Sequence, residues 1–374
     1  MILNYNFKNY NFRLILYVLA LNFIGLLVIN SASGQDSGLV QRQAMGIVLG
    51  LVIAVAISLI PYQKILTYSW GIYAGCIVIL VAVLLFGRNV NGATRWIEVA
   101  GIQFQPSEFV KHGMIVFSSW FLAKNRETLN SVKTLAIIAA VFAVPMALIL
   151  EEPNLSTTLV IMFVLVCMVF VAGLSYRWIF GTLAVIVPVF GLLIYLARFT
   201  DVLTRIPFLQ GYQITRVLAW LNPDEYASTG YQQANSIMAI GSGMLHGKGL
   251  NNNTLASVKN GNFLSEEQTD FIFAVIGEEL GFIGCVAVIA LFAVLVFECL
   301  RMARRARDLS GKLIGCGVSA LLAFQTFANI AVATGIFPNT GLPLPFISYG
   351  VSSLVSMYIG LGVLLNVGLQ RNMR

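Results

Sequence analysis

The sequence predicts an all-α fold: a polytopic membrane protein with about ten transmembrane helices. Hydrophobic residues make up 58% of the 374 residues, charged residues only 10%, and the mean hydropathy is +0.84. Apolar runs close to the roughly 20 residues that cross about 30 Å of hydrocarbon recur along most of the chain. A membrane β-barrel would need alternating segments of about 10 residues, and the runs at 135–150 and 313–333 do not alternate.

We expect a single integral membrane domain over residues 1–374. The first apolar run ends in small residues at 30–33, as a cleaved signal peptide can, but because further spans follow we interpret it as a retained span. The predicted spans cover residues 12–31, 44–60, 68–87, 107–123, 134–150, 155–173, 178–197, 271–298, 313–336 and 346–367.

Charge predicts the orientation of these spans. Most Lys and Arg residues fall in the short loops on one side, including the basic run 301–307, and the other side is more acidic. Because cytoplasmic loops carry the excess of Lys and Arg, both termini are predicted to be cytoplasmic. Topology then explains the net charge of +7, and no nucleic-acid partner is needed. The basic run is expected to lie beside anionic membrane lipids, with a docking site for a cytoplasmic partner as the alternative.

Cysteine and histidine point to no special chemistry. All five cysteines lie in or at the ends of apolar runs with no C-x-x-C spacing, so we interpret them as small core residues. The two histidines, His112 and His246, cannot complete any of the usual zinc ligand sets.

The loop at 88–105 leads into a charged helix start. Pro106 suits the first turn of a helix, and Glu108 favours its positive end. Glu108 and Lys111 are three residues apart, so they can pair where the span enters the membrane, either as a structural ion pair or as part of a site. Trp96 is either an interfacial anchor or a site residue.

A much longer loop, residues 198–269, is predicted to be extracellular and to join spans seven and eight. Loops of this length are usually functional or disordered, and its aromatic and apolar residues favour function. Its Gly-rich stretch at 241–249 serves either as plain turn chemistry or, with Lys248, as a holder of an anionic group. Arg216 and Lys248 suit a phosphate-bearing substrate, although they could equally balance acidic residues of the loop.

Three carboxylates enter the next span together, at Asp270, Glu278 and Glu279. An acid at the mouth of a membrane helix is costly and therefore indicates function, which makes Asp270 the candidate catalytic residue. A continuous helix would turn Glu278 about 80° from Asp270 and Glu279 to the opposite side. Glu278 could then line the same cavity, whereas both glutamates could also form interhelical hydrogen bonds.

An ordered set of motifs resembles the SEDS family of RodA and FtsW proteins, over almost the whole chain. The motifs are Trp96, Gln-Pro-Ser-Glu at 105–108 with Lys111, Gly-Tyr-Gln at 230–232, Ala-Ile-Gly-Ser-Gly at 239–243, Thr-Asp-Phe-Ile-Phe-Ala-Val at 269–275 with Glu-Glu-Leu-Gly at 278–281, and the segment 340–350 around Ser348. Each motif alone is modest, but the ordered set is highly specific.

The resemblance implies a ten-span peptidoglycan glycosyltransferase of the bacterial cytoplasmic membrane. Such a protein polymerises lipid II into a nascent glycan strand outside the membrane, usually with a class B penicillin-binding protein. By resemblance Asp270 is the catalytic acid/base, supported by Trp96, Glu108, Lys111 and Arg216. We add Lys248, Glu278 and Ser348 as candidate substrate-binding residues, and membrane lipids as further partners.

The chain departs from the family pattern at several positions. The usual Gln-Pro-Asp-Leu-Gly-Thr is Glu-Pro-Asn-Leu-Ser-Thr at 152–157, and Asn235, Met244 and Val351 replace the usual Gln, Gly and Gly. The lost carboxylate at Asn154 could alter cation or sugar handling, while Glu152 supplies a charge nearby. These changes leave Asp270 intact, so they bear on substrate detail and partner. The choice between elongation, division and sporulation roles stays open.

The residues themselves suit this chemistry. Glycan extension needs a base for an acceptor hydroxyl and positive charge for a departing pyrophosphate. Asp270 can supply the first, and Arg216, Lys248 or a divalent cation such as Mg²⁺ or Mn²⁺ the second. Two alternatives remain: a flippase for lipid II, and a non-enzymatic scaffold of a cell-wall synthesis complex. The spans show no obvious inverted repeat, which disfavours the flippase, and a scaffold leaves Asp270 unexplained.

Overall fold

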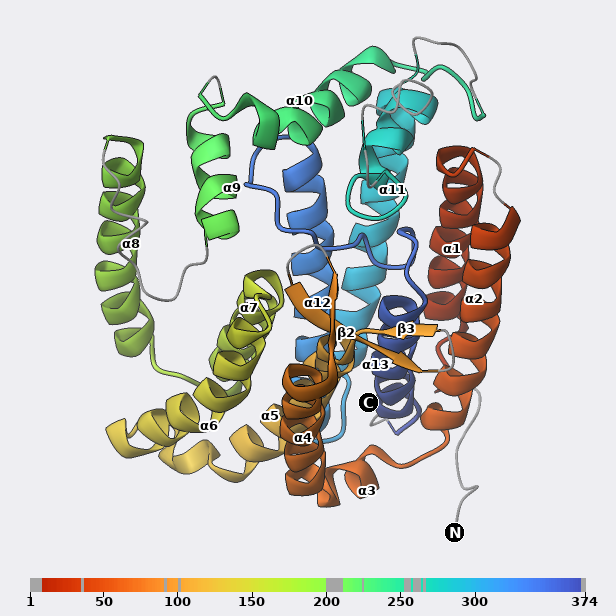
Figure 1. Ribbon diagram of the computed structural model, residues 1–374. Coiled ribbons are helices and arrows are strands. Elements are labelled where there is room, and N and C mark those ends of the chain that lie inside the picture. The colour runs from red at the N-terminus through yellow and green to blue at the C-terminus, as the bar shows by residue number, and fades with distance from the viewer. Residues whose placement is uncertain are drawn as a thin grey trace.

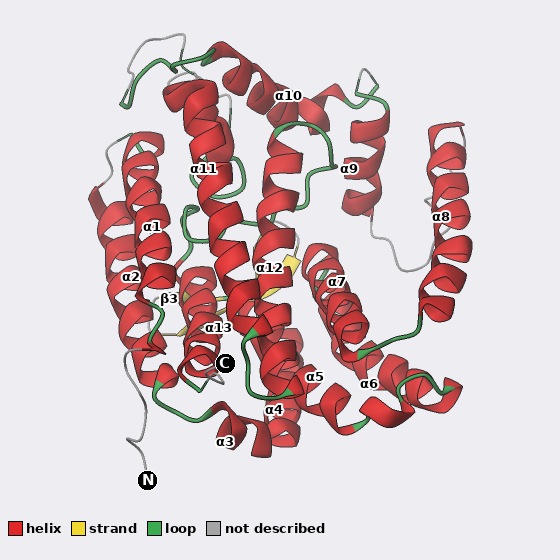
Figure 2. Ribbon diagram, turned by 180° about the vertical axis from the view of Figure 1, so that it is seen from behind, coloured by secondary structure: helices red, strands yellow, loops and turns green. Residues whose placement is uncertain are grey.

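The computed structural model is a bundle of long helices, which confirms the predicted all-α membrane fold (Figures 1 and 2). It describes residues 9–34, 37–90, 93–99, 102–199, 211–223, 225–251, 257, 264 and 267–370. Among these residues, nine helices are long and apolar enough to cross a membrane. They are α1 (Phe12–Ala32), α2 (Ser37–Ser58), α4 (Ser69–Phe86), α6 (Val132–Glu151), α7 (Leu155–Ala172), α8 (Tyr176–Phe199), α11 (Ile272–Arg304), α12 (Leu309–Ala333) and α13 (Val351–Leu369).

The remaining predicted span is α5 (Pro106–Lys124), which differs in composition from the other nine. Pro106 lies in its first turn, as predicted, and the helix carries Glu108 and Lys111 inside the bundle. Both residues are 2% exposed. Charge inside a membrane protein is tolerated where it faces the bundle interior, so the low hydropathy of α5 indicates a central helix.

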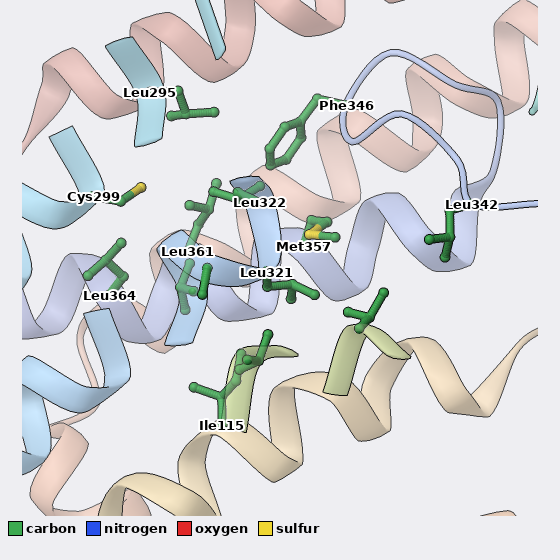
Figure 3. Packing of buried hydrophobic residues seen from close by; sticks show 14 of the residues in the cluster. Ile115, Leu295, Cys299, Leu321, Leu322, Leu342, Phe346, Met357, Leu361 and Leu364 are labelled. Atoms are coloured by element: carbon green, nitrogen blue, oxygen red, sulfur yellow. The ribbon is translucent and has the colours of Figure 1, made fainter. Parts of the chain in front are cut away.

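The bundle has a buried centre and a lipid-facing edge. The apolar windows of α12 and α13 are 78% and 83% buried, whereas that of α8 is 0% buried. In Figure 1, α8 stands at one edge of the bundle, beside α9 (Gly211–Leu221). Figure 3 shows side chains of α5, α11, α12 and α13, and of the loop before α13, packed together at the centre. The labelled ones are Ile115, Leu295, Cys299, Leu321, Leu322, Leu342, Phe346, Met357, Leu361 and Leu364.

Local sequence explains where several helices begin and end. Asn154 and Asp308 accept hydrogen bonds from backbone amides at the starts of α7 and α12, as helix N-caps do. Gly173 ends α7 with φ +110, a left-handed conformation that glycine adopts freely.

The two long loops contain more structure than the sequence predicted. The loop at 88–105 forms an antiparallel sheet of β1 (Arg88–Val90), β2 (Ala93–Val99) and β3 (Ile102–Phe104) in the order β1-β2-β3. The loop at 198–269 contains α9 and α10 (Ala227–Ser242), although its residues 200–210, 224, 252–256, 258–263 and 265–266 lie outside the described part of the chain. These two helices lie at one end of the bundle and α3 (Tyr62–Thr67) at the other (Figure 1). A 3₁₀ turn, η2 (Arg126–Thr128), follows α5.

Predicted and observed bounds differ for several spans: the span predicted at 44–60 is α2, which begins at Ser37, and two further differences concern α13 and α11. The predicted span 346–367 begins five residues later, at Val351, because residues 346–350 belong to a buried loop in which Phe346 has φ +64. The predicted span 271–298 is interrupted at Gly281, where φ is 66° and ψ is −165°. Glu278 and Glu279 therefore belong to a short first half of α11, ahead of the break, and Asp270 lies two residues before this half begins.

Candidate functional site

The backbone around Asp270 is held residue by residue by distant parts of the chain. Asp270 precedes α11, and its carbonyl accepts a hydrogen bond from Asn329 Nδ2 on α12 at 2.8 Å. Ser348 Oγ donates to the carbonyl of Thr269 at 2.6 Å, and Tyr349 N donates to that of Gln268 at 2.9 Å. Ser348 therefore fixes the backbone of Thr269, the residue that precedes Asp270.

The carboxylate of Asp270 and the guanidinium of Arg216 approach the same glycine. A Cβ atom added to Gly341 would lie 3.3 Å from Asp270 Oδ2 and 3.9 Å from Arg216 Nη1. Arg216 comes from α9, and its Nη1 also donates to the carbonyl of Asn339 at 3.4 Å. Gly341 has φ +68, so glycine supplies both the left-handed turn and the space. The Asp270 carboxylate and the Arg216 guanidinium therefore both lie close to Gly341.

The predicted pairing of Glu108 with Lys111 is confirmed. Lys111 Nζ donates to Glu108 Oε1 at 2.7 Å, and their side chains are 1% and 3% exposed respectively. Lys111 Nζ also donates to Gln325 Oε1 of α12 at 3.3 Å. Gln325 is four residues before Asn329, roughly 6 Å along the helix. One face of α12 therefore connects the buried ion pair to the segment that holds Asp270.

Trp96 lies partly exposed on β2, opposite Arg88 in the sheet register. Its neighbour Arg95 fastens this strand to the turn between α6 and α7: Arg95 Nε donates to the carbonyl of Glu152 at 3.2 Å, and Nη2 donates to that of Pro153. The strand that carries Trp96 is thus fixed to the membrane bundle through Arg95.

The turn between α6 and α7, together with the first turn of α7, also contacts α5 and the segment 338–341. Asn154 Nδ2 donates to Ser107 Oγ of α5 at 3.2 Å, next to Glu108, and Ser156 Oγ donates to the carbonyl of Thr340, next to Gly341. Glu152 in this turn is 0% exposed, and neither of its carboxyl oxygens has a hydrogen-bond partner among the described residues. Burial raises the pKa of Glu152 to about 8, against the opposing effect of the Arg95 charge.

Lys248 and Glu278 were both predicted as substrate-binding residues, and the structure pairs them with each other. Lys248 Nζ lies 2.7 Å from Glu278 Oε1, with side chains 22% and 3% exposed. Glu279 points to another helix, as expected for the opposite side: Ser31 Oγ of α1 donates to its Oε1. The two glutamates therefore hold α11 to different neighbours.

Sequence reasoning missed Gln325, Asn329 and Arg95. A signal existed for the first two, because they are polar residues four apart inside the apolar run 313–333, and buried polar residues in a membrane helix indicate contacts across helices. No comparable signal marked Arg95, since the sequence did not predict β2.

No residue set in the described part of the chain fits a metal ion. Among these residues, no three His, Cys, Asp or Glu side chains gather in a way that could hold one. No ligands are therefore assigned to the divalent cation considered from the sequence.

The fold and this polar region define a class: a multi-pass helical membrane protein with a carboxylate at the mouth of a broken helix. A family model described as "Cell cycle protein", which covers FtsW, RodA and SpoVE, matches residues 12–373. The chain belongs to this family, which confirms the resemblance seen in its motifs.

Several relatives match nearly end to end. The peptidoglycan glycosyltransferase MrdB of Escherichia coli K12 is 35% identical over 96% of this chain and 94% of its own length. Stage V sporulation protein E of Bacillus subtilis is 36% identical over 95% of each. The probable peptidoglycan glycosyltransferase FtsW of Geobacter metallireducens is 33% identical over 98% of each.

Two solved structures share the fold. A chain from a peptidoglycan synthase complex, studied for its coordination of polymerization and crosslinking, superposes with a TM-score of 0.77 at 29% identity, covering 96% of this chain and 97% of that one. RodA of Thermus thermophilus superposes with a TM-score of 0.68 at 27% identity, over 98% of each chain.

Proposed function

We propose that this protein is a peptidoglycan glycosyltransferase that polymerises lipid II into glycan strands at the outer face of the bacterial cytoplasmic membrane. Family membership and relatives named as peptidoglycan glycosyltransferases support the reaction class. The observation that carries the proposal is the approach of the Asp270 carboxylate and the Arg216 guanidinium to Gly341, at 3.3 and 3.9 Å from its Cβ position.

Asp270 acts as the general base. Its carboxylate takes the proton from an acceptor sugar hydroxyl, whose oxygen attacks the anomeric carbon of the lipid-linked donor. The bond from that carbon to the pyrophosphate breaks as the new glycosidic bond forms. A single displacement inverts the anomeric centre, so an α-linked donor gives a β-linked polymer. Since the pyrophosphate is a good leaving group, one carboxylate is sufficient here, unlike the pair used in glycoside hydrolysis.

Arg216 stabilises the negative charge that develops on the departing pyrophosphate. A guanidinium presents several N–H donors in a planar fork that matches phosphate oxygens. Its position beside the carboxylate fits a reaction in which proton removal and charge build-up occur a few ångströms apart. Trp96 borders the acceptor or donor sugar, and Glu108 with Lys111 forms the charged floor below. A divalent cation remains part of the proposal as an additional counter-charge for the pyrophosphate.

The proposal includes a partner protein and an orientation of the chain in the membrane. A class B penicillin-binding protein is the proposed partner, because a structural relative belongs to a peptidoglycan synthase complex. The distribution of Lys and Arg supports cytoplasmic termini and an extracellular loop at 198–269.

The direct test supplies purified protein in detergent with lipid II, with Mg²⁺ or Mn²⁺ added in parallel with a chelated sample. Polymeric glycan is the expected product, and comparison of the two samples decides the requirement for a divalent cation. Translocation of lipid II in sealed vesicles without any polymer would reject the glycosyltransferase in favour of the flippase. Neither polymer nor translocation, from folded protein with its partner added, would leave only the scaffold.

A further inference from the structure

A short loop closes the interruption in α11. Residues 243–249, here called the splice loop, follow α10 and lie against the break at Gly281. On the near side of the break, Lys248 N donates to the carbonyl of Glu278 and Gly249 N to that of Glu279, both at 2.9 Å. These carbonyls would otherwise be left without partners at the end of the first half-helix.

The splice loop also binds the far side of the break. Phe282 N donates to the carbonyl of Met244 at 2.8 Å, and Ile283 N donates to that of Leu245 at 3.2 Å. These amides begin the second half of α11 and have no partner within it. One loop therefore satisfies the carbonyls of one half-helix and the amides of the other, which joins the two halves across Gly281.

Glycines make this contact possible. A Cβ added to Gly247, which has φ +77, would lie 2.1 Å from the carbonyl oxygen of Glu279. A Cβ added to Gly243 would lie 1.9 Å from the carbonyl oxygen of Gly277. Gly241, two residues before the loop, would meet nothing within 4 Å. The backbones of the splice loop and of the first half of α11 thus touch directly, from Gly277 to Glu279.

Lys248 is bound to Glu278 twice, through its backbone amide and through its ammonium group at 2.7 Å. A cation paired in this way with a nearly buried carboxylate offers little net charge to a phosphate. Its geometry instead ties the splice loop to the half-helix that follows Asp270.

Met244 shows that this chain retains the loop at a conformational cost. The residue has φ +48, a left-handed conformation that is unfavourable for a side chain with a Cβ. By the motif resemblance the usual residue here is glycine, for which this conformation is free of strain. The hydrogen bonds across the break hold Met244 in place despite the substitution.

The half-helix 272–280 is consequently fixed at both ends. Asn329 and Ser348 hold the segment at Asp270, and the splice loop holds the end at Glu278 and Glu279. We propose that the splice loop is a positioning element for Asp270, in which Lys248 and Glu278 act through the half-helix and not on the substrate. The inference rests on the proposed glycosyltransferase function, since it assigns the role of two residues in that reaction.

A glycine series tests the backbone contact. Gly247→Ala should lower kcat for polymerisation at least about tenfold with little change in KM, because it displaces the end of the half-helix. Gly241→Ala is the matched control and should behave like the wild type. Hydrogen exchange gives a readout that needs no activity: amides of residues 272–283 should lose protection in Gly247→Ala and keep it in Gly241→Ala. Unchanged protection and unchanged kcat in Gly247→Ala would overturn the proposal.

A charge series tests the two side chains without disturbing the glycines. Lys248→Met and Glu278→Gln should each lower kcat at constant KM, since each removes the ion pair that joins the splice loop to the half-helix at 2.7 Å. The double variant Lys248→Met/Glu278→Gln should recover most of the activity, because the backbone bonds remain. A substrate-binding lysine predicts the opposite result: KM for lipid II raised about tenfold or more in Lys248→Met and no recovery in the double variant. That result would reject the positioning role.

The two proposals fail in different ways. If the wild-type protein forms no polymer under any condition, the proposed function is wrong, and hydrogen exchange across residues 272–283 still decides whether the splice loop orders the half-helix. If the wild type polymerises while the exchange and kinetic effects are absent, only the positioning role is wrong.

Discussion

Asp270 combines a backbone fixed by α12 with a carboxylate that lies, like the Arg216 guanidinium, close to Gly341. Asn329 Nδ2 donates to its backbone carbonyl at 2.8 Å. Oδ2 lies near Gly341, as does Nη1 of Arg216. A backbone fixed at this point suits a general base, because it limits the positions that the carboxylate can take.

The buried pair of Glu108 and Lys111 gives a prediction about charge. Either single neutral substitution leaves one ion unpaired at 2% exposure, which typically costs about 3–5 kcal/mol. Glu108→Gln and Lys111→Met should therefore each reduce the yield of folded protein more than the double variant does. Expression and thermal unfolding in detergent measure this effect. A double variant that is as poorly folded as the worse single variant would contradict the prediction.

Activity of the same double variant decides between the two interpretations of the pair. Recovery of folding without polymerisation would assign the pair to the site, and full recovery of polymerisation would make it purely structural.

Glu152 gives a prediction about pH. Its pKa is raised from 4.5 to about 8, so the folded protein keeps a proton that the unfolded chain releases. The free energy of unfolding must then fall as pH rises from about 4.5 to about 8, by at most about 1.4 kcal/mol per pH unit. Glu152→Gln removes this dependence and should be the more stable protein at pH 8. Thermal unfolding at pH 5 and pH 8 measures the difference, and equal pH dependence of the two proteins would contradict it.

At the scale of elements, α12 is the reference against which the other parts are placed. Gln325 contacts Lys111 of α5, and Asn329 contacts both Asp270 and, at 2.8 Å, the carbonyl of Leu342. A helix that is buried over most of its length resists displacement, so groups attached to it share a common frame. The side chains of Gln325 and Asn329 thus connect α12 to α5, to Asp270 and to the loop before α13.

The loop before α13 depends on a close approach to α1. A Cβ added to Gly25 would lie 2.9 Å from Ile347 Cα and from the carbonyl oxygens of Phe346 and Ile347. Gly25→Ala should therefore displace the loop, destabilise the protein by about 1–3 kcal/mol, and lower polymerisation through Ser348. Gly75→Ala on α4 is the control, because its added Cβ meets nothing within 4 Å. Equal stability and activity of the two variants would show that the loop can move without consequence.

Sequence patterns predicted the helices well because run length and hydropathy are local properties. They also predicted the Glu108–Lys111 pair, since residues three apart share a helix face. The break at Gly281 was missed because the apolar pattern of α11 continues through it, and the loop that closes it lies some 35 residues earlier. The contacts of Asn329 and Arg95 depend on tertiary structure, so no local pattern could identify their partners.

At the scale of the whole molecule, an external active site requires that the loop at 198–269 lie outside the cell. The charge pattern predicts that α9 and α10 lie outside the cell and the turn between α11 and α12 inside. Reporter fusions at Asn251 and at Asp308 should therefore report opposite compartments. The same compartment for both would contradict the ten-span arrangement and an external site.

The central claim, that Asp270 is the base of a glycan polymerase, has one direct measurement: polymer formed from lipid II by the purified Asp270→Asn protein. Asparagine keeps the size and the backbone contact with Asn329 but removes basicity, so we expect at least about a 10²-fold loss. Asp270→Glu should recover little, because the carboxylate moves by about one methylene from hydrogen-bond distance. Normal insertion and thermal stability serve as the control. A folded Asp270→Asn protein that forms polymer at close to the wild-type rate would contradict the claim.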